Sequence, residues 1–171
     1  MAKMNHGHFI NPNGFRADIV DISYSWWTLK LHPTVIYRIT LDKINPLIYQ
    51  DKDHLYYQPD RVFDSDLGSV PWFLQWLVPK DLYRTAFVMH DSEHTHGGVW
   101  IASWKDGPYI FQRTTRQQAD NRLRDMVAAL GGGKIHQQGI WSGVRVGGWA
   151  SWNKGDRRKS KLRELGKELL K

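Results

Sequence analysis

The sequence predicts an α+β fold, in which an N-terminal antiparallel β-sheet packs against a helical half with a central antiparallel helix pair. Between residues 15 and 57, short runs rich in β-branched and aromatic residues are separated by turn-forming pairs such as Asn13-Gly14 and Asn45-Pro46. Further along, residues 81–95 and 114–130 carry apolar side chains at helical spacing. A chain of 171 residues that is 41% hydrophobic can bury one sizeable core, so residues 1–153 are expected to form one globular domain.

The strand candidates are ADIVDI (17–22), WWTLKLH (26–32), TVIYRITL (34–41) and PLIYQ (46–50). Side chains alternate between apolar and polar along residues 28–32 and 34–41, which gives each strand one buried and one wetter face. We therefore expect a meander or a small barrel-like sheet whose apolar face packs against the helices that follow.

A polar connection, residues 63–71, leads into a short apolar helix at residues 72–77. Ser69 can cap that helix, because Pro71 suits its first turn. Alternatively, Asp64 and Asp66 present carboxylates to a shared pocket just before the helix begins. Neither interpretation excludes the other.

The helix predicted at residues 81–95 is unusual because its apolar stripe contains two histidines. A rotation of 100° per residue places six side chains on one face and Asp91 at its margin. The six are Leu82, Tyr83, Ala86, Phe87, His90 and His94. Buried imidazoles require a hydrogen-bond partner, a metal ion or a proton-transfer task, so this helix is the candidate functional segment.

The second long helix, residues 114–130, can begin with a capping box formed by Thr114 and Gln117 or by Thr115 and Gln118, and three glycines end it. Its core stripe consists of Ala119, Leu123, Met126, Val127 and Leu130. Asp120 lies at the edge of the stripe, whereas Asp125 faces the opposite side. Because antiparallel neighbours bring such positions together, we expect His90 and Asp120 to touch. Residues 140–148 form a third helical or turn segment.

Two site chemistries are compatible with these residues. His90 and His94 have the four-residue spacing of the HExxH zinc motif, with Asp91 in place of the glutamate, so His90, Asp91, His94 and Asp120 are the candidate ligands for Zn²⁺ or Ca²⁺. Alternatively, His90 is a general base, Asp120 orients its imidazole and Asp91 binds Ca²⁺. His90, Asp91 and Asp120 are the catalytic candidates in either case. A purely structural arrangement, in which His94 and His96 cap the helix end, also fits the pattern.

Two resemblances add to this interpretation. The His90-Asp91 step and a distant aspartate on a second helix are similar to the helix motif of phospholipase A2 enzymes, although His94 stands where those enzymes have tyrosine. The order of the motifs Ser65-Asp66, Ser69-Val70-Pro71, His90-Asp91, Ala119-Asp120 and Val144-Arg145 resembles domain of unknown function number 1353, a family found widely in bacteriophages and prophages. Asp66, Ser69 and Arg145 lie in these motifs and are the candidate substrate-binding residues.

The expected function is a phage-encoded, metal-assisted hydrolase with a His-Asp-Asp centre. The alternative is a non-enzymatic virion component, or a binder of host factors or nucleotide signals, in which the cluster is structural. Of the net charge of +7, residues 154–171 contribute eight Lys or Arg and three acids, so they form a basic C-terminal helix or tail that can contact polyanions. With no cysteine, no signal peptide and no apolar stretch of transmembrane length, the chain is expected in the host cytoplasm or in the virion.

Overall fold

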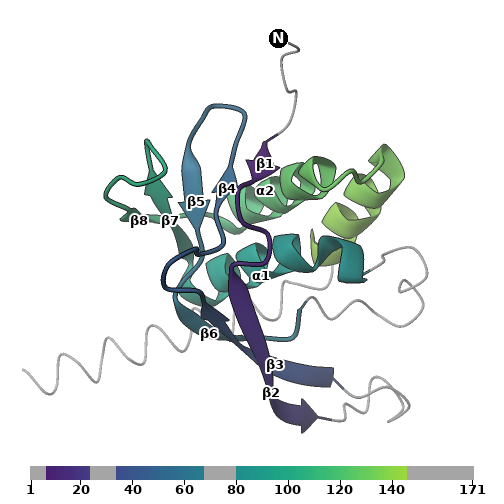
Figure 1. The fold of residues 1–171 in the computed structure, drawn as a ribbon. Helices are drawn as coiled ribbons and strands as arrows, with labels where there is room; N and C mark the ends of the chain where they lie inside the picture. The colour runs from purple at the N-terminus through teal and green to yellow at the C-terminus, as the bar shows by residue number, and fades with distance from the viewer. Residues whose placement is uncertain (1–6, 24–33, 68–79, 146–171) are drawn as a thin grey trace, which may run out of the picture.

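The computed structural model describes residues 7–23, 34–67 and 80–145, which fold into two antiparallel sheets and a packed pair of helices (Figure 1). The α+β class predicted from the sequence is therefore confirmed. The strands are β1 (His8–Phe9), β2 (Phe15–Ser23), β3 (Thr34–Leu41), β4 (Tyr49–Gln50), β5 (Tyr56–Gln58), β6 (Val62–Ser65), β7 (Gly98–Ala102) and β8 (Ile110–Arg113). The two long helices are α1 (Lys80–His96) and α2 (Arg116–Ala129), and residues 134–145 are also helical.

The larger sheet has five strands in the order β1-β4-β5-β7-β8. Its last two strands come from the segment between α1 and α2, where no strand was predicted. β7 is buried along most of its length because β5 and β8 flank it and α1 contacts it, whereas β8 is an exposed edge strand. Runs of four or five residues are too short to show a clear periodicity, which explains why the sequence pattern did not reveal them.

The smaller sheet consists of β2, β3 and β6. At its centre, Ile39 is fully buried and lies opposite Ala17 on one side and Phe63 on the other. Residues 62–65 form the third strand, so the segment first interpreted as a polar connection begins within a sheet. The alternation along β6 turns Phe63 and Ser65 inward, which carries Ser65 towards α1.

The helices α1 and α2 run antiparallel, as predicted. The backbone N–H of Thr114, just before α2, donates to the carbonyl of Gly97, just after α1, at 3.2 Å. At the other end of the pair, Tyr83 lies against Gly132. Figure 1 shows the two helices on one side of the strands.

Burial along α1 exceeds the predicted stripe. Tyr83, Ala86, Phe87 and His90 are buried as expected, but Leu82 is 54% exposed, so that part of the prediction is wrong. Four further side chains are buried, and these are Val88, Met89, Ser92 and Glu93. Because α1 contacts β6 and β7 as well as α2, it is covered on more than one face.

The start of α2 shows the capping box of Thr115 and Gln118, which was one of the two predicted pairs. Its buried side chains include Leu123, Met126 and Val127 together with Asp120, whereas Asp125 is exposed as predicted. The third helical segment begins at residue 134, earlier than predicted. Residues 26–32, 72–77 and 154–171 lie outside the described part of the chain. Within that part, the length and hydropathy of the helices do not suit a membrane-spanning segment.

Candidate metal centre

Three side chains from the two helices converge on one point. The Nε2 atom of His90 lies 3.0 Å from Oδ1 of Asp120, and the Nε2 atom of His94 lies 3.3 Å from the same oxygen. One ligand atom from each of the three residues falls within 4.8 Å of the others. The predicted contact between His90 and Asp120 is therefore present, and His94 shares it.

The local structure explains this convergence. Residues four apart lie one above the other on a helix, and the rings of His90 and His94 stack at a tilt of 42° with their centroids 4.0 Å apart. Zn²⁺ binds histidine nitrogen at about 2.0–2.1 Å, so two ligands of a tetrahedral ion are roughly 3.3 Å apart. The separations of Asp120 from the two histidines fit such a site as well as they fit direct hydrogen bonds.

The second oxygen of Asp120 faces arginine side chains. Nη1 of Arg145 lies 3.3 Å from Oδ2, and Nε of Arg116 lies 3.7 Å from it. Asp120 is fully buried, whereas the side chain of Arg145 is 38% exposed. The cluster thus joins a buried carboxylate to an arginine whose side chain is partly exposed.

Asp91 lies on the other side of the His90 ring. Its Oδ1 is 3.7 Å from Nδ1 of His90, and its Oδ2 accepts a hydrogen bond from the hydroxyl of Ser65. The same hydroxyl accepts from the backbone N–H of Leu67 at 2.9 Å, and Leu67 has a φ of 53°, which few residues other than glycine adopt. Asp91 is therefore placed to orient His90, and it is not among the residues whose ligand atoms converge.

The charges of the cluster shift its protonation equilibria. Burial by itself would lower the pKa of His90, but the hydrogen bonds and charges of Asp120 and Asp91 outweigh it and raise the pKa to about 9. Burial lowers the pKa of His94, and the neighbouring His90 adds to that effect. Burial would raise the pKa of Asp120, yet His90 and His94 hold it well below its usual range. A metal-free cluster therefore favours a protonated His90 between two carboxylates.

Two further polar pairs flank the centre. Glu93, which is 1% exposed, pairs with Arg122 of α2, whose guanidinium lies 4.5 Å above the Tyr57 ring. Nδ1 of His96 lies 2.7 Å from Asp60, which also accepts a hydrogen bond from the indole of Trp100. The sequence interpretation missed both pairs.

A signal for the buried Glu93 was present in the helical pattern. At 100° per residue, Glu93 lies only about 20° from Ala86 around the helix, at the margin of the predicted stripe. A carboxylate so close to buried positions indicates a buried partner. The sequence pattern held no comparable signal for Asp60 and His96, because their contact joins a loop to the end of α1.

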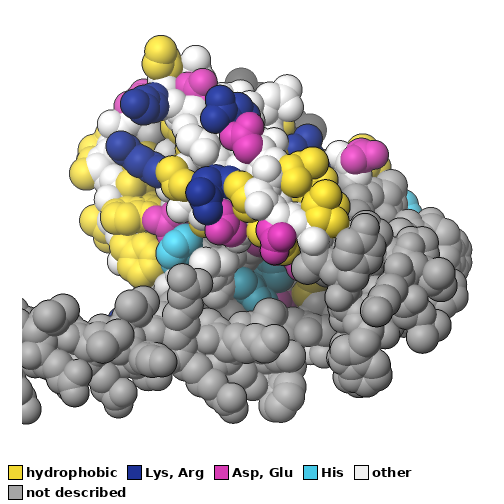
Figure 2. All heavy atoms as spheres, turned by 90° about the horizontal axis from the view of Figure 1, so that it is seen from below, with side chains coloured by type: hydrophobic (Ala, Val, Ile, Leu, Met, Phe, Trp, Pro, Cys, Tyr) yellow, Lys and Arg dark blue, Asp and Glu magenta, His cyan; other side chains and the backbone are white. Residues whose placement is uncertain are grey.

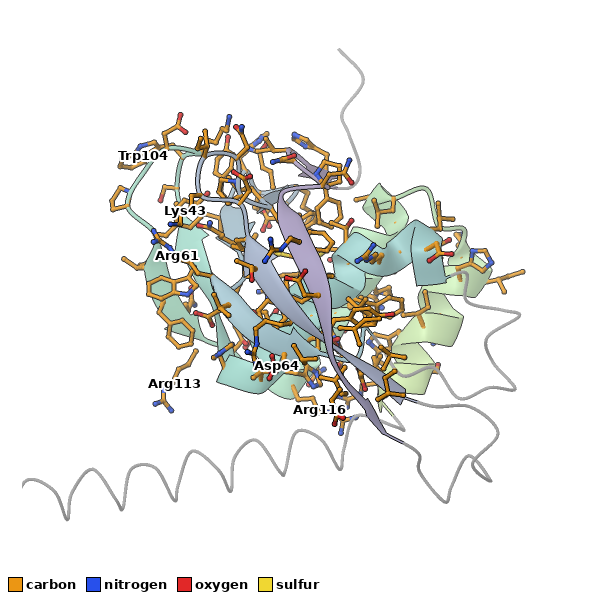
Figure 3. All side chains as sticks on the ribbon, turned by 60° about the horizontal axis from the view of Figure 1, so that its bottom comes forward. Lys43, Arg61, Asp64, Trp104, Arg113 and Arg116 are labelled. Carbon is orange, nitrogen blue, oxygen red and sulfur yellow. The ribbon has the colours of Figure 1, made fainter. Side chains whose placement is uncertain are left out.

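The substrate-binding candidates have different positions. Arg145 belongs to the cluster, and Asp66 follows directly after Ser65 and is half-buried, whereas Ser69 lies outside the described residues. Asp64, which one interpretation of the sequence directs to a shared pocket, faces outward on β6 and pairs with Arg38 at 2.9 Å. In Figure 3, Arg113 projects away from the fold, whereas Arg116 lies against it.

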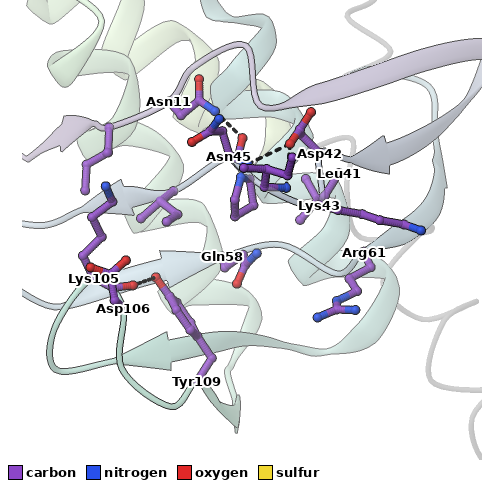
Figure 4. Close-up of a pocket in the computed structure, with 14 residues that line it drawn as sticks. Asn11, Leu41, Asp42, Lys43, Asn45, Gln58, Arg61, Lys105, Asp106 and Tyr109 are labelled. Atoms are coloured by element: carbon purple, nitrogen blue, oxygen red, sulfur yellow. Dashed lines mark hydrogen bonds between the residues drawn. The ribbon is translucent and has the colours of Figure 1, made fainter.

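Figure 2 shows histidine and acidic side chains next to one another on the underside of the molecule. A separate cavity of about 770 Å³, shown in Figure 4, is lined by residues that include Lys43, Arg61, Lys105 and Tyr109. It shares no residue with the cluster of His90, His94 and Asp120. The cavity and the cluster are therefore separate features of the fold.

Comparison with known proteins gives a family. Neither the curated proteins nor the solved structures contain a match to the chain. The model of the family described as Protein of unknown function (DUF1353) matches residues 42–144, a range that includes His90, Asp91, His94 and Asp120. Because this match covers more than half of the 171 residues, the chain belongs to the DUF1353 family.

Proposed function

We propose that this protein is a phage-encoded hydrolase that uses a divalent metal ion held by His90, His94 and Asp120. The observation that carries the proposal is the convergence of two imidazole nitrogens and one buried carboxylate oxygen within 4.8 Å. Three protein ligands leave a position for water, which is the arrangement typical of hydrolytic metal sites.

The donor set favours Zn²⁺ or a similar transition ion over Ca²⁺. Imidazole nitrogen suits zinc, whereas calcium takes six to eight oxygen ligands, and the converging group offers a single carboxylate. Asp91 lies at the opposite nitrogen of His90 and supplies the outer carboxylate that commonly orients a histidine ligand. The hydroxyl of Ser65 in turn holds Asp91.

A bound ion would lower the pKa of its water to near 7, which supplies a nucleophile at neutral pH. His90 and His94 would hold the ion from one helix and Asp120 from the other. Asp66 and Arg145 would contribute polar groups to the substrate side. Asp91 is proposed to hold His90 in one orientation and not to bind the ion.

The alternative hydrolytic scheme, with His90 as general base, receives less support. The local similarity to phospholipase A2 enzymes favours it, but each ring nitrogen of His90 lies next to a carboxylate, so neither is directed at a water molecule.

One observation favours a non-enzymatic role as a second candidate. The two oxygens of Asp120 already have partners, with His90 and His94 on Oδ1 and Arg145 on Oδ2. A network satisfied in this way can fix the helix interface without any chemistry. The protein would then be a virion component or a binder of host factors or nucleotide signals.

The phage origin of the protein, its location and its polyanion contacts are also proposals. The phage origin rests on the order of motifs that the chain shares with its family. We place the protein in the host cytoplasm or in the virion, and we assign polyanion contacts to the basic residues 154–171.

Zinc binding decides between the two candidates. Calorimetric titration of the metal-free protein should show one Zn²⁺ per chain, and His94→Tyr and Asp120→Asn should both weaken binding while the circular dichroism spectrum stays unchanged. Asp125→Asn is the matched control, because Asp125 is exposed on the same helix. Chelation should abolish the hydrolysis of chromogenic ester substrates.

The non-enzymatic candidate makes the opposite prediction. If Zn²⁺ does not bind, or if His94→Tyr and Asp120→Asn bind it as tightly as the parent protein, the cluster is structural and the hydrolase proposal fails.

A further inference from the structure

A divalent ion at this centre would add positive charge to a cluster that already holds two arginines. The guanidinium groups of Arg116 and Arg145 lie beside Asp120, and a second carboxylate, of Asp91, lies on the other side of His90. Histidines that bind a metal ion are neutral, so a divalent ion would leave two positive charges in excess. Asp120 is 0% exposed and the Arg116 side chain 16%, and excess charge in such a setting requires an anionic partner.

Arg145 is the group that can reach such a partner. Its Nη1 contacts Asp120, while 38% of its side chain remains exposed. A guanidinium carries five N–H donors, so the contact with one carboxylate oxygen leaves several for another ligand. The guanidinium carbon lies 5.7 Å from the centre of the Trp141 ring, which limits the directions in which the side chain can move.

The surroundings hold Arg145 close to the metal ligands. Nη2 of Arg116, in the first turn of α2, donates to the carbonyls of Val144 and Arg145. The indole N–H of Trp141 donates to the side chain of Asn121 at 3.0 Å. Both contacts tie the segment that carries Arg145 to α2, the helix that also carries Asp120. The guanidinium therefore stays beside the carboxylate that would bind the ion.

We propose that the substrate of this centre is a phosphate ester, and that Arg145 binds its anionic oxygens. The inference rests on the proposed function, because it names the substrate class for the same metal centre. A phosphate group carries one or two negative charges, which offset half or all of the excess, and its oxygens match the planar fork of arginine. A metal ion and an arginine acting together on a phosphoryl group are a common means of stabilising the charge that develops during its transfer.

Inorganic phosphate and Co²⁺ provide a direct test on the full-length chain. Cobalt replaces zinc with a visible absorption spectrum that reports on its ligands, so a spectral change on adding phosphate places the anion at the ion and not at the basic terminus. We expect phosphate to change the spectrum of the parent protein. Arg145→Gln should weaken phosphate binding about tenfold or more without weakening cobalt binding, because Arg145 contacts Oδ2 of Asp120 and not the Oδ1 that faces the two histidines.

The controls separate the contribution of Arg145 from general effects of charge. Arg113→Gln removes an exposed arginine that projects away from the fold and should bind phosphate as the parent does. Arg145→Lys keeps the charge but loses the fork, so its phosphate affinity should fall between that of the parent and that of Arg145→Gln. It also provides a test if Arg145→Gln does not fold.

Four results would overturn the inference. If cobalt binds but phosphate leaves its spectrum unchanged, or if Arg145→Gln binds phosphate as well as the parent, the substrate class is wrong while the metal centre stands. If acetate changes the spectrum at lower concentration than phosphate, the site selects carboxylates. If the parent protein does not bind cobalt at all, the metal centre itself fails and the inference fails with it.

Discussion

Replacing Asp120 with asparagine should change how the stability of the metal-free protein depends on pH. In the folded protein the carboxylates raise the pKa of His90 from 6.5 to about 9. A raised pKa in the folded state means that protonation stabilises the fold fully below pH 6.5, and that this contribution is lost as the pH rises through 9. This rise in the pKa corresponds to about 3 kcal/mol.

The loss of the Asp120 charge removes the largest of the effects that raise this pKa, and burial then favours a neutral imidazole. We therefore compare the unfolding free energy of the parent protein with that of Asp120→Asn at each pH. The parent's advantage should be about 3 kcal/mol larger at pH 6 than at pH 10. Urea denaturation followed by tryptophan fluorescence, with a chelator present at each pH, measures the difference. Groups that titrate alike in both proteins cancel in this comparison.

Asp125→Asn should follow the parent curve, since Asp125 is exposed on the same helix. The reasoning fails if the stability difference between the parent and Asp120→Asn stays constant from pH 6 to pH 10. Such a result would show that the contact with Asp120 is not what keeps His90 protonated.

Two other changes test separate parts of the molecule. Arg122→Leu leaves Glu93 buried without its partner, so the unfolding free energy should fall by about 3–5 kcal/mol, and a loss below 1 kcal/mol would mean that the pair is not desolvated as the structure shows. Deleting residues 154–171 should leave the melting temperature nearly unchanged while lowering affinity for heparin at low salt, and a large drop in melting temperature would show that these residues pack against the core.

Much of the central helix pair could be predicted from the sequence. Helical periodicity is a local property, so the pattern alone placed His90 within the stripe of one helix and Asp120 at the edge of the stripe of the next. Antiparallel packing of two neighbouring helices then brings these two positions together. The contact of 3.0 Å between the two side chains agrees with that prediction.

The face to which each strand side chain points was harder to predict, because the alternation along a strand has a period of two. A shift of one residue exchanges the buried and exposed faces, and without the pairing of β6 with β3 nothing in the sequence determined that Ser65 faces Asp91 while Asp64 faces Arg38. The short strands β7 and β8 were missed for a related reason, since their place in the sheet depends on β5, about forty residues earlier.

The sequence by itself determined which histidines and aspartate of the two helices face one another, because such residues at buried helical positions are visible in a periodic pattern. Only the tertiary structure decided which side chains lie at the point of convergence and which lie behind it. It placed Asp91 behind His90, and it brought Arg145 from the third helical segment onto the second oxygen of Asp120. These contacts join elements far apart in the sequence, and their geometry is set by how the helices and sheets pack, which no local pattern encodes.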